Sequence, residues 1–187
     1  MFPAMLATLF SVAFMVALHA RAVPERRIVA QLGLAVSEMA AVTIVGDYFV
    51  QLSVIQPSVL AGEADGIPLL TQYNPHGVFI ALEELGYLLL SLSLACMAWA
   101  LSSSTRLERM VRWLFAGGLL VNVLALAGIL LRHGSDRGYR FEVIVISVNW
   151  LVLLVGTFMM AAIFRRDRAA GDRAEGTSHG PESSAHA

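Results

Sequence analysis

Four carboxylic acids lie in stretches of the sequence that are otherwise apolar. Glu83 and Glu84 stand side by side in the run FIALEELGYLLL, and Glu38 and Asp47 lie within a second long apolar run. A carboxyl group in such surroundings can bind a cation, transfer a proton, or bond a polar group of another helix. Because an acid inside a bilayer costs about 2.5–3.5 kcal/mol or more, we expect Glu38 and Glu83 to face the interior of a helical bundle.

Polar residues near the middle of the other apolar runs provide partners for these acids. Tyr87, Asn122 and Asn149 each lie at a depth similar to that of Glu38. A cluster of Glu38 and these three residues near the centre of the bilayer is therefore geometrically possible. The alternative is that the two asparagines only hold helices together, a contact that contributes about 0.6 kcal/mol on average.

A second polar layer is expected nearer the outer membrane surface. Asp47 and Gln51 are four residues apart and share a helix face. Glu83 and Glu84 lie about 10 Å below the start of their helix at a rise of 1.5 Å per residue. Because adjacent helical positions differ by about 100°, the two glutamates cannot share a face. We expect Glu83 to point inward and Glu84 to face a neighbouring helix or the headgroups.

Helical geometry limits how Glu38 and Asp47 combine. The two residues are nine positions apart, which is about 180° around a helix. They cannot both face one axis unless the helix is packed on both sides or bent, and Gly46 would permit a bend. The alternative for Asp47 is a purely interfacial position.

Composition and the length of the apolar runs predict an all-α integral membrane protein. Of the 187 residues, 57% are hydrophobic and 14% are charged, whereas soluble domains carry about 25% charged residues. A transmembrane helix needs about 20 apolar residues. We predict a bundle of five transmembrane helices over residues 1–164, followed by a polar, disordered tail over 165–187. The apolar segments span residues 2–19, 28–56, 77–101, 113–131 and 141–164.

The distribution of arginine predicts the orientation of the chain. All 13 basic residues are arginines, and ten of them lie in the first and third connections and in the tail. Three, at Arg132, Arg137 and Arg140, lie in the last connection. Since basic residues favour the cytoplasmic side, we expect a cell (inner) membrane protein with its N-terminus outside and its C-terminus in the cytoplasm.

The connection before the third segment ends in a predicted helix start. Asn74 can cap free backbone N–H groups, and Pro75 is tolerated in a first helical turn. We therefore expect the helix that carries Glu83 and Glu84 to begin at Asn74–Pro75.

Several kinds of site are disfavoured by the sequence. The single cysteine, Cys96, excludes an intrachain disulfide and a cysteine zinc site. His76, His133, Asp47 and Glu83 are metal-ligand types on the outer side, but no local ligand spacing joins them. We expect neither a metal nor a cofactor. No basic patch for nucleic acid is present, and the expected partners are membrane lipid and either a second copy or another membrane protein.

One stretch resembles a known group of proteins. Residues 47–87, which contain the strings YFVQL and QYNPHGVFIALEELGY, resemble the signature region of an uncharacterised family of bacterial multi-pass membrane proteins. The resemblance implies a membrane location and a helical architecture. It implies no activity.

Three functions are compatible with this pattern. The first is binding or translocation of a small molecule or ion through an outer-facing polar site between the second and third apolar segments. The second is a non-catalytic membrane subunit that binds a partner helix. The third is an intramembrane enzyme acting on a lipid or isoprenoid, with Glu38 and Glu83 as general acid and base.

Overall fold

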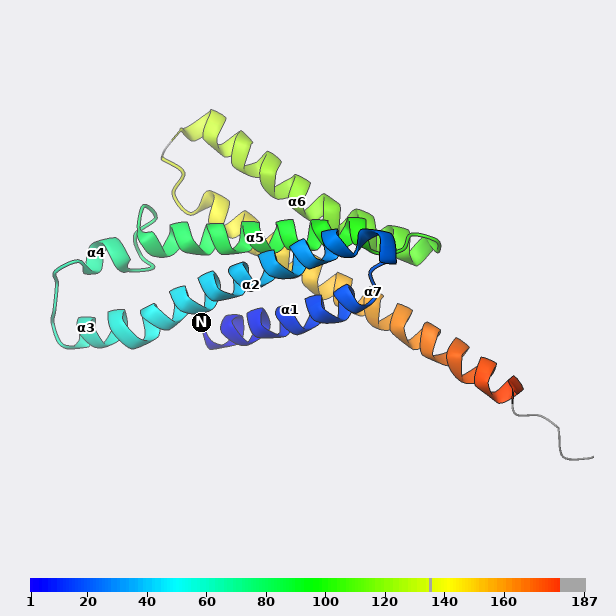
Figure 1. The fold of residues 1–187 in the computed structure, drawn as a ribbon. Helices are drawn as coiled ribbons and strands as arrows, with labels where there is room; N and C mark the ends of the chain where they lie inside the picture. Colours follow the sequence, from blue (N-terminus) through cyan, green and yellow to red (C-terminus); the bar gives the residue numbers. More distant parts are fainter. Residues whose placement is uncertain (135, 179–187) are drawn as a thin grey trace, which may run out of the picture.

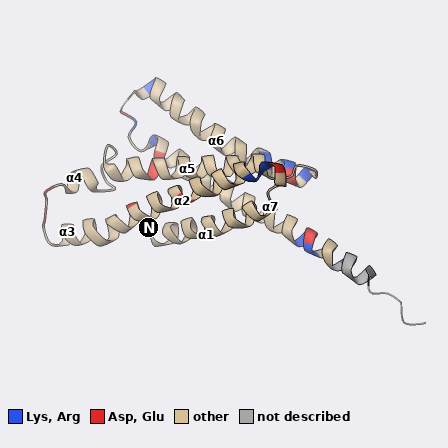
Figure 2. Ribbon diagram, in the orientation of Figure 1, with Lys and Arg blue, Asp and Glu red and all other residues tan. Residues whose placement is uncertain are grey.

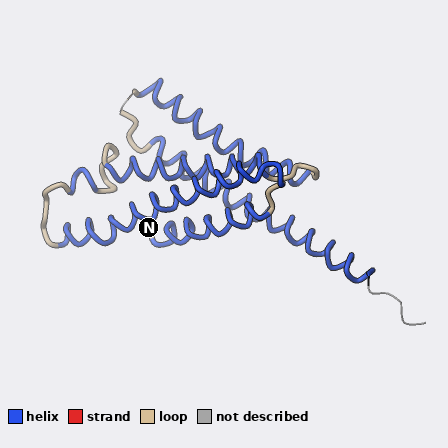
Figure 3. The backbone as a smooth tube through the Cα atoms, in the orientation of Figure 1, coloured by secondary structure: helices blue, strands red, loops and turns tan. Residues whose placement is uncertain are grey.

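The described part of the chain is a bundle of helices. The computed structural model describes residues 1–134 and 136–178, and no strand occurs within these ranges (Figures 1 and 3). The long helices are α1 (Phe2–Ala20), α2 (Arg27–Val50), α5 (Val78–Ala100), α6 (Arg106–His133) and α7 (Arg140–Ser178). The short elements are a 3₁₀ turn (Pro24–Arg26), a π-helical turn (Gln51–Ile55), α3 (Gln56–Leu60) and α4 (Ile67–Leu70).

The predicted fold class is confirmed. Five helices of the described chain are long and apolar enough to cross a membrane, and they span Phe2–Ala20, Pro24–Leu60, Val78–Ala100, Arg106–His133 and Arg140–Gly171. Their length and composition are those of a multi-pass membrane protein.

The centre of the bundle is α5. Of its most apolar 18-residue stretch 61% is buried, against 17–33% in the other four spans, so α5 is surrounded by protein while the others retain wide apolar faces. Figure 1 shows α5 between α2 and α6, with α7 crossing nearby. The side chains of Glu83, Glu84, Tyr87, Ser91 and Ser93 on α5 are all buried.

Close packing of α2 on α5 depends on two glycines. A Cβ atom added to Gly86 would lie 2.4 Å from Cγ1 of Ile44, and one added to Gly33 would lie 3.0 Å from Cβ of Cys96. Small residues let membrane helices approach each other closely. This approach allows side chains of α2 and α5 to bond directly near the end of the bundle where α3 and α4 lie. This end is named the outer end, and residues 56–77 are named the outer loop.

A π-helical turn continues α2 directly into α3. Gln51, the first residue of this turn, is buried, and its side-chain amide donates a hydrogen bond to the carbonyl of Leu70 in α4. Turns of this kind inside helices often occur at functional sites. Gln51 therefore fixes the outer loop over the end of α2.

The start of α5 differs from the sequence expectation. The helix begins at Val78, with Gly77 as its N-cap residue, and not at Asn74–Pro75. The Asn74 side chain instead accepts a hydrogen bond from the N–H of His76, which forms a local turn before the helix.

The end of α7 also differs. We predicted disorder from residue 165, but α7 continues as a helix to Ser178 (Figure 1). The helix-forming Arg and Ala residues after 164 explain this extension. Residues 179–187 lie outside the described ranges.

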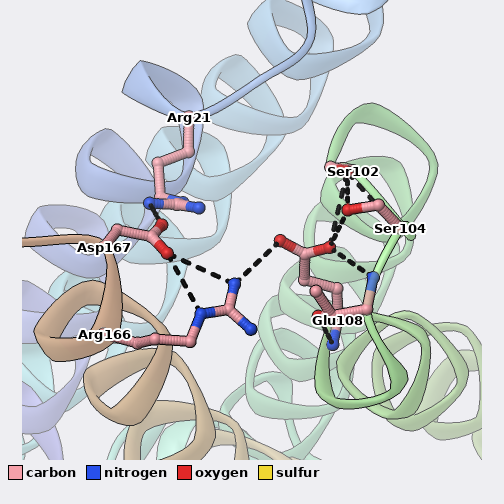
Figure 4. A network of polar contacts seen from close by, with 7 residues as sticks. Arg21, Ser102, Ser104, Glu108, Arg166 and Asp167 are labelled. Carbon is pink, nitrogen blue, oxygen red and sulfur yellow. Dashed lines mark hydrogen bonds and ion pairs between the residues drawn. The ribbon is translucent and has the colours of Figure 1, made fainter. Parts of the chain in front are cut away.

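An ion-pair network joins three helices at the end of the bundle opposite the outer loop. Figure 4 shows Asp167 between Arg21 and Arg166, with distances of 2.5 Å and 3.2 Å, and Arg166 lies 3.8 Å from Glu108. Glu108 also forms a capping box with Thr105 at the start of α6. The arginine and Asp167 side chains are partly exposed, so each pair contributes little alone.

The close contact between Gly86 of α5 and Ile44 of α2 predicts that a larger residue at position 86 lowers the stability of the protein. Gly86→Ala is expected to lower the free energy of unfolding by about 1–3 kcal/mol, because its methyl group overlaps Ile44. Gly128→Ala is the matched control, since nothing lies within 4 Å of its added Cβ. Thermal unfolding in detergent measures both. Equal melting temperatures for the two variants would contradict the packing described for α2 and α5.

Candidate functional site

A contact between Tyr48 and Glu83 joins α2 to α5 within the outer half of the bundle. The Tyr48 hydroxyl donates a hydrogen bond to Oε1 of Glu83, and both side chains are buried. The Tyr48 ring packs on Phe79, with ring centroids 5.7 Å apart. The Glu83 carboxyl is therefore held by a neutral donor on the neighbouring helix, inside the protein as predicted.

Two further carboxyl groups lie beside Glu83. Glu142, in the first turn of α7, is half-buried and lies close to the Glu83 carboxyl. Asp47 is buried on the inward face of α2 and close enough to Glu83 to repel its charge. Oδ2 of Asp47 is buried and has no hydrogen-bond partner among the described residues. Three helices therefore bring three acids to one place.

Glu84 is also buried, which differs in part from the expectation. Only 5% of the residue is exposed, and its Oε2 lies 2.9 Å from Nη1 of Arg137 in the connection between α6 and α7. As predicted, Glu84 points along a different face of α5 from Glu83. The loop arginine covers it, so it does not extend to the headgroups.

These four acids form the outer carboxyl cluster, which consists of Asp47, Glu83, Glu84 and Glu142. Arg137 is the one basic side chain that forms an ion pair with a member of the cluster among the described residues. A carboxylate in a low-dielectric site is costly without a partner, and neighbouring carboxylates repel each other. The cluster can therefore be fully ionised only with added positive charge.

Tyr87 connects the cluster to the middle of the bundle. Its hydroxyl accepts a hydrogen bond of 3.3 Å from the indole N–H of Trp150 and lies close to the Tyr48 hydroxyl. A chain of polar groups therefore runs from Trp150 through Tyr87 and Tyr48 to Glu83.

An apolar groove bounds this chain on one side. The groove has a volume of about 380 Å³ and lies between α1 and α7, with Tyr87, Leu90 and Trp150 among its lining residues. Phe10, Phe14 and Phe158 form part of its walls. The polar contacts of the site thus end at Tyr87 and Trp150, where the groove begins.

A second polar group lies deeper and links α5, α6 and α7. The amide of Asn122 donates a hydrogen bond of 2.8 Å to the Ser91 hydroxyl, which in turn bonds Oδ1 of Asn149 at 3.1 Å. The Asn149 amide donates to the carbonyls of Tyr87 and Val145. This arrangement fits the alternative in which the two asparagines hold helices together.

The predicted position of Glu38 is wrong. Its side chain is exposed on the outward face of α2, and it does not join Tyr87, Asn122 and Asn149. The inward face of α2 carries Asp47, about 180° away, so the two acids cannot both face α5. The paired acid and base chemistry expected of Glu38 and Glu83 therefore has no geometric basis within one chain.

Five contributors to the site were not among the predicted site residues: Tyr48, Ser91, Arg137, Glu142 and Trp150. A tyrosine or tryptophan near a helix end is typical of the aromatic belt. For this reason the sequence did not distinguish Tyr48, which bonds Glu83, from an ordinary interfacial tyrosine. Glu142 begins an apolar segment, where a carboxylate commonly caps a helix start. Arg137 lies on the side of the membrane where the distribution of arginine predicts few basic residues. This exception was the one indication in the sequence that Arg137 has a buried acidic partner.

The outer surface beside the cluster is hollowed. A cleft of about 190 Å³ is lined by Pro75, His76, Gly77, Ile80, Ala81 and Arg137. No group of three or more His, Cys, Asp or Glu side chains is arranged to hold a metal ion within residues 1–134 and 136–178. The cluster is thus an acidic site beside an outer cleft.

No protein-family model, curated protein or solved structure matches this chain. The resemblance of residues 47–87 to a family of membrane proteins stays a prediction.

The side chains of Asn122 and Asn149 differ in how many of their hydrogen-bonding groups have partners, and this difference predicts unequal effects on stability. Asn149→Leu is expected to cost about 1–2 kcal/mol of unfolding free energy, because the side chain forms three hydrogen bonds. Asn122→Leu should cost less than about 0.6 kcal/mol, since its Oδ1 is buried without a partner among the described residues. Reversible unfolding in mixed micelles measures both. A larger loss for Asn122→Leu would contradict the network.

Proposed function

We propose that this multi-pass protein binds a small cation, inorganic or organic, at the outer carboxyl cluster and passes it across the membrane. The proposal rests on one observation: three buried carboxyl groups of α2 and α5 and the half-buried Glu142 of α7 lie together, and among the described residues one arginine forms an ion pair with them. A cation supplies the positive charge that such a site lacks. The negative potential of the cluster also disfavours anions.

The cleft provides a route to the cluster from the outer surface. Arg137 lines the cleft and also pairs with Glu84, so movement of this one side chain would expose the acids to water. Arg137 is about one-third exposed, so water and an entering cation can reach its side chain. Displacement of the guanidinium by an entering cation would keep the charge balance at Glu84.

The residues that contact the cation are proposed to be Asp47 and Glu83, with Tyr48 positioning the Glu83 carboxyl. Asp47 supports this role because its Oδ2 is buried and without a hydrogen-bond partner among the described residues. Gln51 is proposed to position the outer loop, since its amide bonds Leu70. Asn122 and Asn149 are assigned to packing.

The location proposed is the cell (inner) membrane, with the N-terminus outside and the C-terminus in the cytoplasm. The arginines of the α1–α2 turn, of the first turns of α6 and of the end of α7 lie toward one side of the bundle (Figure 2). Of the three arginines at the opposite end, Arg137 is neutralised by Glu84. A reporter enzyme active only in the cytoplasm should work when fused to the C-terminus. Activity of a periplasm-specific reporter at the C-terminus would contradict the proposed orientation.

The cation proposal predicts a loss of transport in Glu83→Gln. Purified full-length protein in liposomes should take up Na⁺, K⁺ or the organic cation ethidium in a saturable manner. Glu83→Gln keeps a hydrogen-bond acceptor for Tyr48 but removes a negative charge, so we expect at least a tenfold weaker apparent affinity, about 1.4 kcal/mol.

Glu63→Gln is the matched control for this measurement. Glu63 is exposed in the outer loop, and its substitution makes the same change of charge outside the cluster. Its uptake should equal that of the natural sequence. Absence of uptake and binding of all three cations by the natural sequence, or equal behaviour of Glu83→Gln and Glu63→Gln, would refute the proposal.

A further inference from the structure

A stripe of exposed residues follows the outward face of α2. Its members recur at spacings of three and four residues, so they fall within one narrow arc of the helix. We define this Glu38 stripe as Gln31, Ala35, Glu38, Val42, Gly46 and Phe49, all of them exposed. The opposite face of α2 packs on α5 and α1.

The stripe contains an acid that nothing in the described chain covers. Glu38 forms no hydrogen bond or ion pair with any described residue. It lies about halfway along the Pro24–Leu60 span. Carboxyl groups inside a bilayer are costly and normally face protein or water. A partner helix over this face would remove the exposure of Glu38 to hydrocarbon.

The hydrogen-bonding groups of the Glu38 stripe are complementary to those of a second copy of the stripe. The amide of Gln31 carries both donors and an acceptor, and so does the carboxyl of Glu38 in its neutral form. Two copies of either side chain can therefore satisfy each other across a two-fold axis. The stripe has no basic residue, and a partner that offered only donors or only acceptors would leave one of these groups half satisfied.

The shape of the stripe suits close approach of a second helix. Ala35 and Gly46 are small, and no atom lies within 4 Å of a Cβ added to Gly46. By contrast, Gly33 of α2 and Gly86 of α5 lie where these two helices pack against each other. Alternating spacings of three and four residues are those of left-handed helix pairs, and small residues permit tight contact between membrane helices.

We propose that the Glu38 stripe is the interface with a second copy of this chain, with α2 packed against α2 around a two-fold axis parallel to the membrane normal. Such isologous pairs are the commonest oligomers. The interface lies on the face of α2 opposite Asp47. It stands independently of the proposed cation transport and leaves the outer carboxyl cluster within each chain.

Cysteine cross-linking in membranes of the expressing cells tests the interface. In the full-length Cys96→Ala background, Val42→Cys is placed on the stripe and Leu120→Cys on the exposed face of α6. The two positions lie at comparable depth, since each is fourteen or fifteen residues from the inner end of its helix. With a membrane-permeant oxidant, Val42→Cys should form a product of twice the chain mass, and Leu120→Cys should not.

Substitution of Glu38 then separates a specific pair from a random collision. Glu38→Leu should lower the yield of the Val42→Cys product by about threefold to twentyfold, the range expected for loss of an interhelical polar contact. Glu38→Gln keeps a donor and an acceptor and should restore most of the yield. Glu83→Gln should leave it unchanged, so failure of cation transport and failure of the dimer are distinguishable.

Three results would overturn the proposal. These are equal yields for Val42→Cys and Leu120→Cys, a Val42→Cys product whose mass requires a different protein, and no dependence of the yield on Glu38.

Discussion

The hydrogen bond between Tyr48 and Glu83 holds a carboxyl group inside the bundle at a depth where exposure to lipid would be costly. It forms because α2 and α5 approach closely at Gly86, which has no side chain to keep Ile44 away. Once Glu83 is fixed there, Asp47 and Glu142 lie beside it, and Glu84 is left on another face of α5 with Arg137 as its partner. The outer half of the protein is thus organised by the need to keep acids away from hydrocarbon.

The two ends of the bundle differ in the balance of acidic and basic side chains. At the end shown in Figure 4, Asp167 and Glu108 are balanced by Arg21 and Arg166, and this network needs no further ion. At the outer end, four acids lie together, and among the described residues Arg137 is the one arginine that pairs with any of them, through Glu84. A stabilising network would be expected to approach neutrality, as the first does. The excess of acid over base at the outer end is the feature on which the proposed cation site rests.

The sequence predicted the features that depend on local pattern. Apolar runs near bilayer length identified the five helices, and the cost of an intramembrane acid identified Glu83 correctly. The same argument failed for Glu38 because a single sequence shows that Glu38 and Asp47 lie on opposite faces but not which face meets α5. Glu142 and Tyr48 were missed because their partner, Glu83, is distant in sequence. Pairings of that kind depend on how the helices pack.

The distance between the Tyr48 ring and the Glu83 carboxyl in a lipid bilayer tests the central claim most directly. Solid-state NMR of the full-length chain with ¹³C-labelled tyrosine and glutamate should give a cross-peak between Cζ of Tyr48 and Cδ of Glu83. The assignment is checked by its loss in Glu83→Gln. A Glu83 carboxyl signal with no tyrosine cross-peak and with contacts to lipid acyl chains would contradict the account.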